Sequence, residues 1–223
     1  MSKQADIYRE LLSHHPVLRS RFDGVDLSDE GQFKGLRRYY GQSASMEEFF
    51  LEHRYYDFIV SRAVMEHVTD PVVGLERMSA ALLPCGMMLH KVDLRDHGMF
   101  SQQFHELKFL EVPEWAYRRM VQASGGPNRI MIDQYRAALS RLGLEYSLFI
   151  TRLAGVGDIT PHLPYEVLPK SLVEQSLGFV RSVRHRFCKE MQGLSDEDLS
   201  VGGIFMVARK ARHASEALVP TRS

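Results

Sequence analysis

The chain has few cysteines and no long apolar run, and each absence excludes a class of protein. Its two cysteines, Cys85 and Cys188, lie far apart and form no CxxC pair. This argues against a zinc ribbon or a disulfide framework and favours a reducing compartment. No apolar run approaches the roughly 20 residues that span a bilayer, and the N-terminus lacks the apolar segment of a signal peptide. We therefore predict a cytoplasmic protein that does not enter the membrane.

The chain also lacks a net charge of either sign. Lysine and arginine together number 28, as do aspartate and glutamate. A chain without a global positive field has no general means of holding a nucleic acid backbone, which leaves only a local patch such as Arg181, Arg184 and Arg186. With 223 residues, of which 44% are apolar, the chain can bury a sizeable core. We predict a single domain over residues 1–211 and a flexible tail over residues 212–223.

Strands alternate with helices in the middle of the chain, which predicts an α/β fold. Residues 56–60 and 87–94 are typical of buried strands. A helix is predicted between these two strands. Asp70 and Pro71 are typical of its start, and Leu83-Pro84-Cys85-Gly86 is typical of its end. Short connections between such elements indicate a mostly parallel sheet, whose ligands bind at the carboxyl ends of the strands.

The remainder of the chain continues this pattern with two interruptions. The sequence predicts helices over residues 7–21, 132–142 and 171–191, a helix or turn over residues 46–53, and strands over residues 22–28, 144–153 and 201–208. Residues 98–129 and 154–170 lose this regularity. We predict that they are insertions that cover a substrate.

Several segments together resemble one family. Asp57-Phe58-Ile59-Val60-Ser61, then Met65-Glu66-His67-Val68, Asp70-Pro71 and Leu83-Pro84-Cys85-Gly86 resemble the fourth strand, the following helix and the fifth-strand entry of class I S-adenosylmethionine-dependent methyltransferases of the small-molecule type. Gly24-Val25-Asp26-Leu27-Ser28 resembles the second strand of that family. The resemblance implies a Rossmann-like sheet with an antiparallel last strand, S-adenosyl-L-methionine as cofactor, and methylation of an oxygen or nitrogen of a small molecule or glycan.

The same resemblance implies where the cofactor binds. The acid that ends the second strand binds the ribose hydroxyls in the family, the loop after the third strand contacts adenine, and small residues after the fourth strand border the cofactor. The alternatives are a helix-capping acid for the first position and plain polar loops for the others. The implied cofactor-binding residues are Asp26, Gln42, Ser43, Ala44, Ser61, Arg62 and Ala63.

A dense group of ionisable residues, which includes His90, Asp93 and Asp96, follows the strand at 87–94. Methyl transfer to oxygen or nitrogen requires the acceptor to lose a proton, so a base in this group is useful. We predict His97 as the base, with His105 as the second choice. The alternative is a solvated loop of charges. The spacing of these residues matches no metal-binding motif, so no metal site is predicted.

The sequence also departs from the family. The first strand and its glycine-rich turn, where only glycine lets the backbone approach the cofactor, are not recognisable, and the helix expected after them begins near Met1. This favours an alternative in which the chain is a non-catalytic methyltransferase-like partner, or a truncated inactive fragment. A sheet without that central strand has an exposed edge, which predicts a protein partner or a homodimer that covers it.

Overall fold

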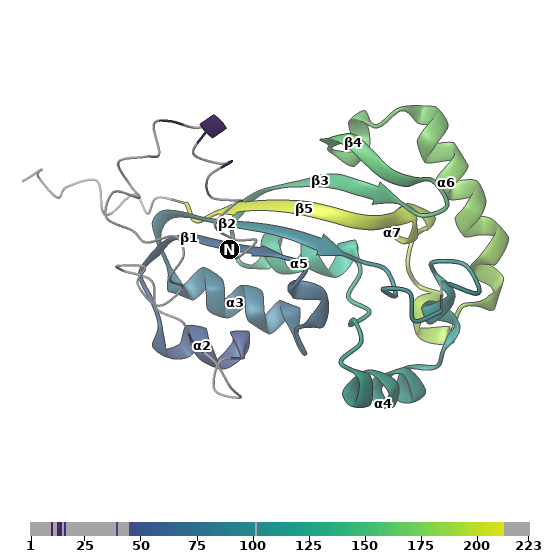
Figure 1. Ribbon diagram of the computed structural model, residues 1–223, viewed down its shortest axis with the longest axis horizontal. Helices are drawn as coiled ribbons and strands as arrows, with labels where there is room; N and C mark the ends of the chain where they lie inside the picture. The colour runs from purple at the N-terminus through teal and green to yellow at the C-terminus, as the bar shows by residue number, and fades with distance from the viewer. Residues whose placement is uncertain are drawn as a thin grey trace, which may run out of the picture. The chain divides into compact units, whose positions relative to one another are not determined.

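A computed structural model of the chain describes residues 45–100 and 102–211, and the separate residues 10, 13, 14, 16 and 39 (Figure 1). Within these residues five strands form one sheet in the order β1-β2-β5-β3-β4. The strands are β1 (Tyr56–Arg62), β2 (Leu82–Asp93), β3 (Glu145–Leu153), β4 (Gly157–Leu163) and β5 (Val201–Arg209). The predicted α/β fold is confirmed.

The sheet is more mixed than predicted. Strands β1 and β2 pair in parallel, whereas β5 runs antiparallel to both of its neighbours, β2 and β3. Strand β4 is also antiparallel to β3. The prediction of an antiparallel last strand is therefore confirmed, but the prediction of a mostly parallel sheet is wrong for the described strands, because β5 inserts between two strands of the opposite direction.

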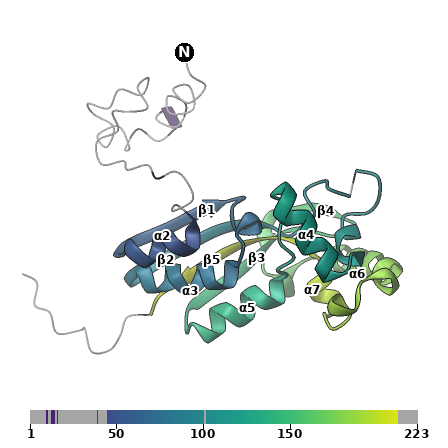
Figure 2. The same cartoon turned by 90° about the horizontal axis from the view of Figure 1, so that it is seen from below.

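The helices cover one face of the sheet and one end of it. Helices α2 (Met46–Glu52), α3 (Pro71–Ala81) and α5 (Ile132–Arg141) lie under the sheet in Figure 1, and Figure 2 shows the same three side by side. Helices α4 (Glu114–Ser124), α6 (Lys170–Val183) and α7 (Asp196–Ser200) gather beyond the end of the sheet. Short 3-10 turns, η3 (Met65–His67), η4 (Lys108–Glu111), η5 (Tyr165–Val167), η6 (Arg184–Arg186) and η7 (Lys189–Met191), connect these elements.

The start of α3 follows the prediction closely. The Asp70 side chain accepts the Val73 N–H at 3.0 Å, and Pro71 occupies the first helical turn, where no backbone hydrogen bond is lost. The helix buries Leu75 and Met78 completely against the sheet. A capping residue, an early proline and apolar side chains on one face thus suffice to form this helix.

The predicted turn after α3 is instead the first part of β2. The strand begins at Leu82, and its register with β1 shifts between the pairs Tyr56–Leu82 and Phe58–Met87. The extra residues form an irregularity in which Cys85 has a left-handed backbone, with φ +64°. Such a bulge permits the strand to continue through residues that are typical of a turn.

The two segments predicted as irregular insertions contain regular structure. Helix α4 lies within residues 98–129, and β4 lies within residues 154–170. The predicted helix over residues 171–191 is too long, because α6 ends at Val183 and gives way to η6 and η7. The strand predicted over residues 22–28 lies outside the described residues, as does most of the helix predicted over residues 7–21.

Two hydrophobic cores hold these elements together. The main core packs α3 and α5 against the sheet, with Met78, Met88, Tyr135 and Ile204 among its buried residues. A second core joins η4 and α4 to α6, and it includes Leu107, Phe109, Leu110, Tyr117, Val180 and Val183. The segment after β2 therefore contributes buried residues to a packed core and is not a loose loop.

Candidate functional site

The candidate site lies where β1 and β2 end together. The two strands pair in register, Ser61 with His90 and Arg62 with Lys91, and the Ala63 N–H extends the ladder by donating to the Lys91 carbonyl at 3.1 Å. Ala63 then leaves the strand with a left-handed backbone, φ +54°. This turn directs the chain from the sheet into η3, so the residues after β1 lie over the strand ends.

A largely apolar cavity of about 500 Å³ opens between α2 and this turn. Helix α2 begins at Ser45, whose hydroxyl caps it by accepting the Glu48 N–H at 3.2 Å. The cavity is lined by Ser45, Met46, Phe49, Phe50, Ala63, Val64, His67, Val68 and Thr69.

A smaller polar cavity of about 230 Å³ adjoins the first at Ala63, which lines both. Its walls are the ends of β1, β2 and β3 and the start of β5, where Gly202 and Gly203 leave room. The charged residues that line it are Arg62, Glu66, Lys91, Asp93, Arg95, Arg152 and Asp158.

Most charges of the polar cavity are paired. Arg95 donates two hydrogen bonds to the Asp93 carboxylate, at 2.8 and 2.5 Å, and Arg152 contacts Asp158 at 2.9 Å. Burial alone raises the pKa of Asp93, but the hydrogen bonds and charge of Arg95 outweigh it and keep that pKa below its usual range. Among the described residues, Arg62 and Lys91 form no ion pair.

Glu66 is the most buried acid of the site. Its residue is only 1% exposed, one carboxylate oxygen accepts the Asp93 N–H at 3.4 Å, and the other has no partner within the described residues. Desolvation raises the pKa of Glu66 above its ordinary value, against the opposing effect of backbone hydrogen bonds and of the nearby histidines.

The two predicted bases lie in different environments. His97 has its Nε2 atom 3.7 Å from both Glu66 Oε1 and Asp93 Oδ2, at the strand ends. His105 instead contacts Glu111 at 2.9 Å and packs against Phe179 of α6. Within the described residues, neither the hydrogen bond nor the ring contact of His105 involves His97.

The predicted cofactor-binding residues are divided between the described part and the rest of the chain. Ser61, Arg62 and Ala63 lie at the end of β1, as their position in the sequence requires, and Arg62 and Ala63 line cavities there. The Ser61 hydroxyl is 2.7 Å from His90 Nδ1, so it faces the core. The remaining predicted contacts, Asp26, Gln42, Ser43 and Ala44, lie outside the described residues.

Asn128 shapes this site, although it is not among the predicted site residues. The Asn128 side chain donates to the carbonyls of Met65 and Val68, at 2.9 and 3.0 Å, and its N–H donates to the Glu66 carbonyl at 2.6 Å. These bonds fix η3 from a loop some sixty residues away. Only the Gly-Gly-Pro turn before Asn128 marks this loop in the sequence.

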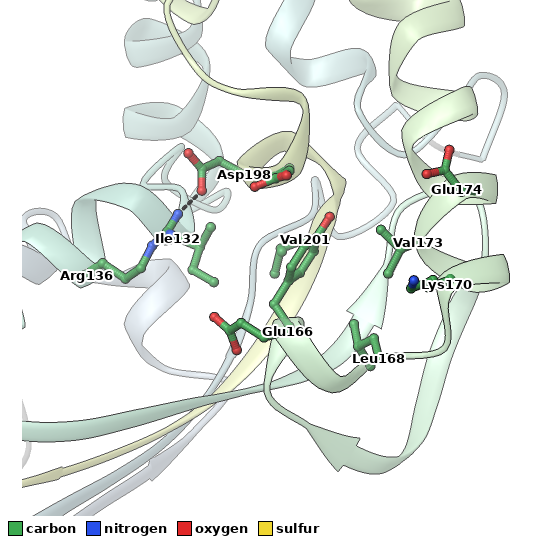
Figure 3. A pocket seen from close by; sticks show the side chains of 11 residues that line it. Ile132, Arg136, Glu166, Leu168, Lys170, Val173, Glu174, Asp198 and Val201 are labelled. Atoms are coloured by element: carbon green, nitrogen blue, oxygen red, sulfur yellow. Dashed lines mark hydrogen bonds and ion pairs between the residues drawn. The ribbon is translucent and has the colours of Figure 1, made fainter.

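A third cavity, of about 370 Å³, lies between α5, η5, α6 and α7 (Figure 3). Arg136 and Asp198 form an ion pair at its wall, and Glu166 and Glu174 make the lining acidic. None of the residues predicted for the cofactor or for catalysis lines it.

Comparison with known proteins identifies the family. Residues 7–147 match the family described as a methyltransferase domain. A search of curated protein sequences found no match.

Among solved structures, the chain is similar to a protein assigned as a sarcosine dimethylglycine methyltransferase from Galdieria sulphuraria, with 18% identity, a TM-score of 0.42, and coverage of 88% of this chain and 67% of that one. It is also similar to a SAM dependent methyltransferase from Archaeoglobus fulgidus, with 11% identity, a TM-score of 0.40, and coverage of 93% and 82%. A third similar structure is phosphoethanolamine N-methyltransferase 2 of Haemonchus contortus, bound to S-adenosyl-L-methionine, with 14% identity, a TM-score of 0.34 and coverage of 70% and 33%. The chain thus spans a third of the length of the nematode enzyme.

A Rossmann-like α/β sheet with its cavities at the strand ends defines a class of nucleotide-cofactor proteins. The family match covers more than half of the chain, and the chain belongs to the methyltransferase-domain family. S-adenosyl-L-methionine is the cofactor of this domain family, and methyl transfer is the reaction of the family. Within the described residues, no helix combines the length and apolar character needed to cross a bilayer.

Proposed function

We propose that this protein transfers the methyl group of S-adenosylmethionine to an oxygen or nitrogen of a small anionic molecule or glycan. The observation that carries the proposal is the pair of cavities that meet at Ala63, one largely apolar and one charged. A nucleoside with a flat base suits an apolar cavity, whereas a polar acceptor suits a charged one. The two ligands would then meet at the turn after β1.

The apolar cavity fits the adenine end of the cofactor. Met46, Phe49 and Val64 offer apolar surface to the faces of a purine, and the Ser45 and Thr69 hydroxyls offer hydrogen bonds to its edge. Ser45 directly follows Gln42, Ser43 and Ala44, the residues for which the sequence predicts adenine contacts. We propose that the small side chain of Ala63 leaves the space between the two cavities open.

The polar cavity favours an acceptor with a negative charge. Among the described residues, Arg62 and Lys91 line it without a charged partner, and they are register partners on adjacent strands. Two cations side by side can bind a carboxylate or a phosphate with charge-assisted hydrogen bonds. His97 lies beside this cavity, through its contacts with Glu66 and Asp93, and we propose that it accepts the proton of the acceptor.

The test is calorimetry on the full chain with S-adenosylmethionine and with its demethylated product, followed by detection of that product in the presence of candidate acceptors. We expect binding of the cofactor and turnover with carboxylated or phosphorylated hydroxyl and amine compounds. An Ala63→Leu variant should lose cofactor binding, while Ala137→Leu, at an exposed position on α5, serves as the control. Tight cofactor binding that is unaffected by Ala63→Leu would contradict the assignment of the apolar cavity.

One observation favours the second candidate, a non-catalytic methyltransferase-like partner protein. Strand β1 lies at the edge of the described sheet, and Phe58 and Val60 are 61% and 68% exposed. Such apolar side chains on an edge strand are suited to a protein partner or a second copy of the chain. Absence of cofactor binding together with a concentration-dependent dimer in sedimentation experiments would favour this candidate.

A further inference from the structure

Three potential metal ligands converge above the strand ends. One ligand atom from each of Glu66, His67 and His97 lies within 4.8 Å of the others. His97 Nε2 is 3.7 Å from Glu66 Oε1, and the two imidazole rings contact edge to face with centroids 4.8 Å apart. Ligand atoms around a tetrahedral zinc ion are about 3.3 Å apart, so small side-chain rotations would bring these atoms to a common cation.

The cluster contains a buried carboxylate with one unpartnered oxygen. Glu66 is 1% exposed, and its Oε2 atom has no hydrogen-bond partner in the described part of the chain. No lysine or arginine of that part forms an ion pair with it. The hydroxyl of Tyr135 is also buried without a partner in that part. Buried carboxylates are normally hydrogen-bonded, paired or bound to a metal, so the unpartnered Oε2 atom makes Glu66 a candidate cation ligand.

His67, the histidine of η3, has a hydrogen bond that is typical of a histidine metal ligand. His67 Nδ1 lies 3.2 Å from the Gly125 carbonyl, to which it can donate its proton. That tautomer leaves Nε2 with its lone pair free for a cation, and a backbone carbonyl behind a histidine is a usual support for a ligand. The Asn128 hydrogen bonds described above hold the same turn, so Glu66 and His67 are presented by a fixed backbone.

The loop that carries His97 is fixed as well. The buried Asp96 carboxylate accepts the N–H groups of Gly98 and Phe100 at 3.0 and 2.7 Å. His97 itself has a left-handed backbone, φ +53°, which turns the chain back toward η3. The third ligand is therefore placed by the loop after β2, thirty residues from the other two.

We propose that Glu66, His67 and His97 form a binding site for a divalent transition-metal ion of the zinc class, with one coordination position left open toward the polar cavity. One carboxylate and two imidazoles form a donor set suited to zinc and related ions, and three protein ligands are typical of sites that also bind a water molecule or substrate. Glu66 lines the polar cavity and His67 the apolar one, so the ion would lie between them. With the ion bound, His97 would be a ligand rather than the base proposed above, and a hydroxyl bound to the ion loses its proton more readily than a free one.

The test measures metal binding itself, on the full chain, after removal of metals by a chelator. We expect one zinc ion per chain by calorimetry, with a Kd below about 10 µM, and a visible absorption band typical of tetrahedral coordination when cobalt replaces zinc. Glu66→Gln, His67→Asn and His97→Asn should each weaken zinc binding by at least about tenfold. His162→Asn, which changes an exposed histidine on β4, is the matched control and should bind as the unmodified chain does.

The result that overturns the proposal is absence of stoichiometric zinc and cobalt binding, or binding that all three variants retain. Circular dichroism shows whether each variant folds, and the exposed His67 keeps the test valid if Glu66→Gln does not fold. The metal site and the proposed reaction fail independently, because zinc binding is measured without S-adenosylmethionine. Cofactor binding without zinc binding would refute only the metal site, and the reverse would refute only the proposed function.

Discussion

His90 should make the fold sensitive to mild acid. It lies on the face of β2 that packs against the helices, it is fully buried, and its only hydrogen bond within the described residues is to the Ser61 hydroxyl at 2.7 Å. Its Nε2 atom is buried without a partner in the described part of the chain. Burial lowers the pKa of His90 from 6.5 to about 4, because a charged imidazole there would lose its hydration.

The sign and size of the effect follow from this difference in pKa. The unfolded chain takes up a proton on His90 below about pH 6.5, whereas the folded chain does so only near pH 4. Stability contributed by the neutral ring is therefore present above pH 6.5 and is lost as the pH falls toward 4. A difference of about 2.5 pKa units corresponds to about 3 kcal/mol of unfolding free energy. That is a large fraction of the 5 to 15 kcal/mol typical of a domain.

The assay is urea denaturation of the chain and of His90→Asn at several pH values between about 7 and 4.5. Asparagine keeps a group near the Nδ1 position but does not titrate. We expect the unfolding free energy of the unmodified chain to change little above pH 6.5 relative to the variant, and to fall by about 1.4 kcal/mol per pH unit below it. His185→Asn, at an exposed position in η6, is the control and should not change the slope. Parallel curves for the chain and for His90→Asn would refute the reasoning.

Three further predictions concern the site. Arg62→Gln should raise the KM for an anionic acceptor about tenfold and leave kcat nearly unchanged, because it removes one charge-assisted contact; initial-rate kinetics would show this, and a fall in kcat alone would contradict it. Asn128→Ala should reduce the unfolding free energy by about 2 to 3 kcal/mol in urea denaturation, since three hydrogen bonds are lost; a change below about 0.5 kcal/mol would count against its structural role. Gly203→Ala should lower the free energy of unfolding by about 1 to 3 kcal/mol, because the added Cβ would lie 2.7 Å from Thr151 Oγ1. The control Gly202→Ala, whose Cβ would lie 3.4 Å from Arg152 Cγ, should be tolerated, and equal melting temperatures of the two variants would refute the difference.

Elements with strong local signals were predictable from the sequence. Helix α3 was predictable because Asp70 and Pro71 are a local start signal, and β5 because its apolar residues are contiguous. The early start of β2 was not predictable, because Pro84 and Gly86 are typical of a turn and only pairing with β1 keeps them in the strand. Helix α4 escaped prediction because its buried contacts belong to the second core, which forms from distant segments.

The candidate site was predictable only in part, for a similar reason. The resemblance to the family indicated Ser61 to Ala63, and the ionisable residues after the strand at 87–94 indicated the group around His97. The approach of His97 to Glu66 depends on the left-handed backbone at Ala63 and His97. These residue types do not predict such a conformation. Likewise the Asn128 contacts with η3 join segments about sixty residues apart. Periodicity reports which face of an element is buried, but it does not report which distant loop meets it.

The position of β5 in the sheet has a consequence for protein synthesis. It is the last strand of the described chain, yet it pairs with both β2 and β3 and joins the two halves of the sheet. On the ribosome, β2 and β3 must wait with unpaired backbone edges until residue 209 has left the exit tunnel. Pairing in this sheet is therefore completed late, and nascent chains stalled before Val201 should be strong clients of ribosome-associated chaperones.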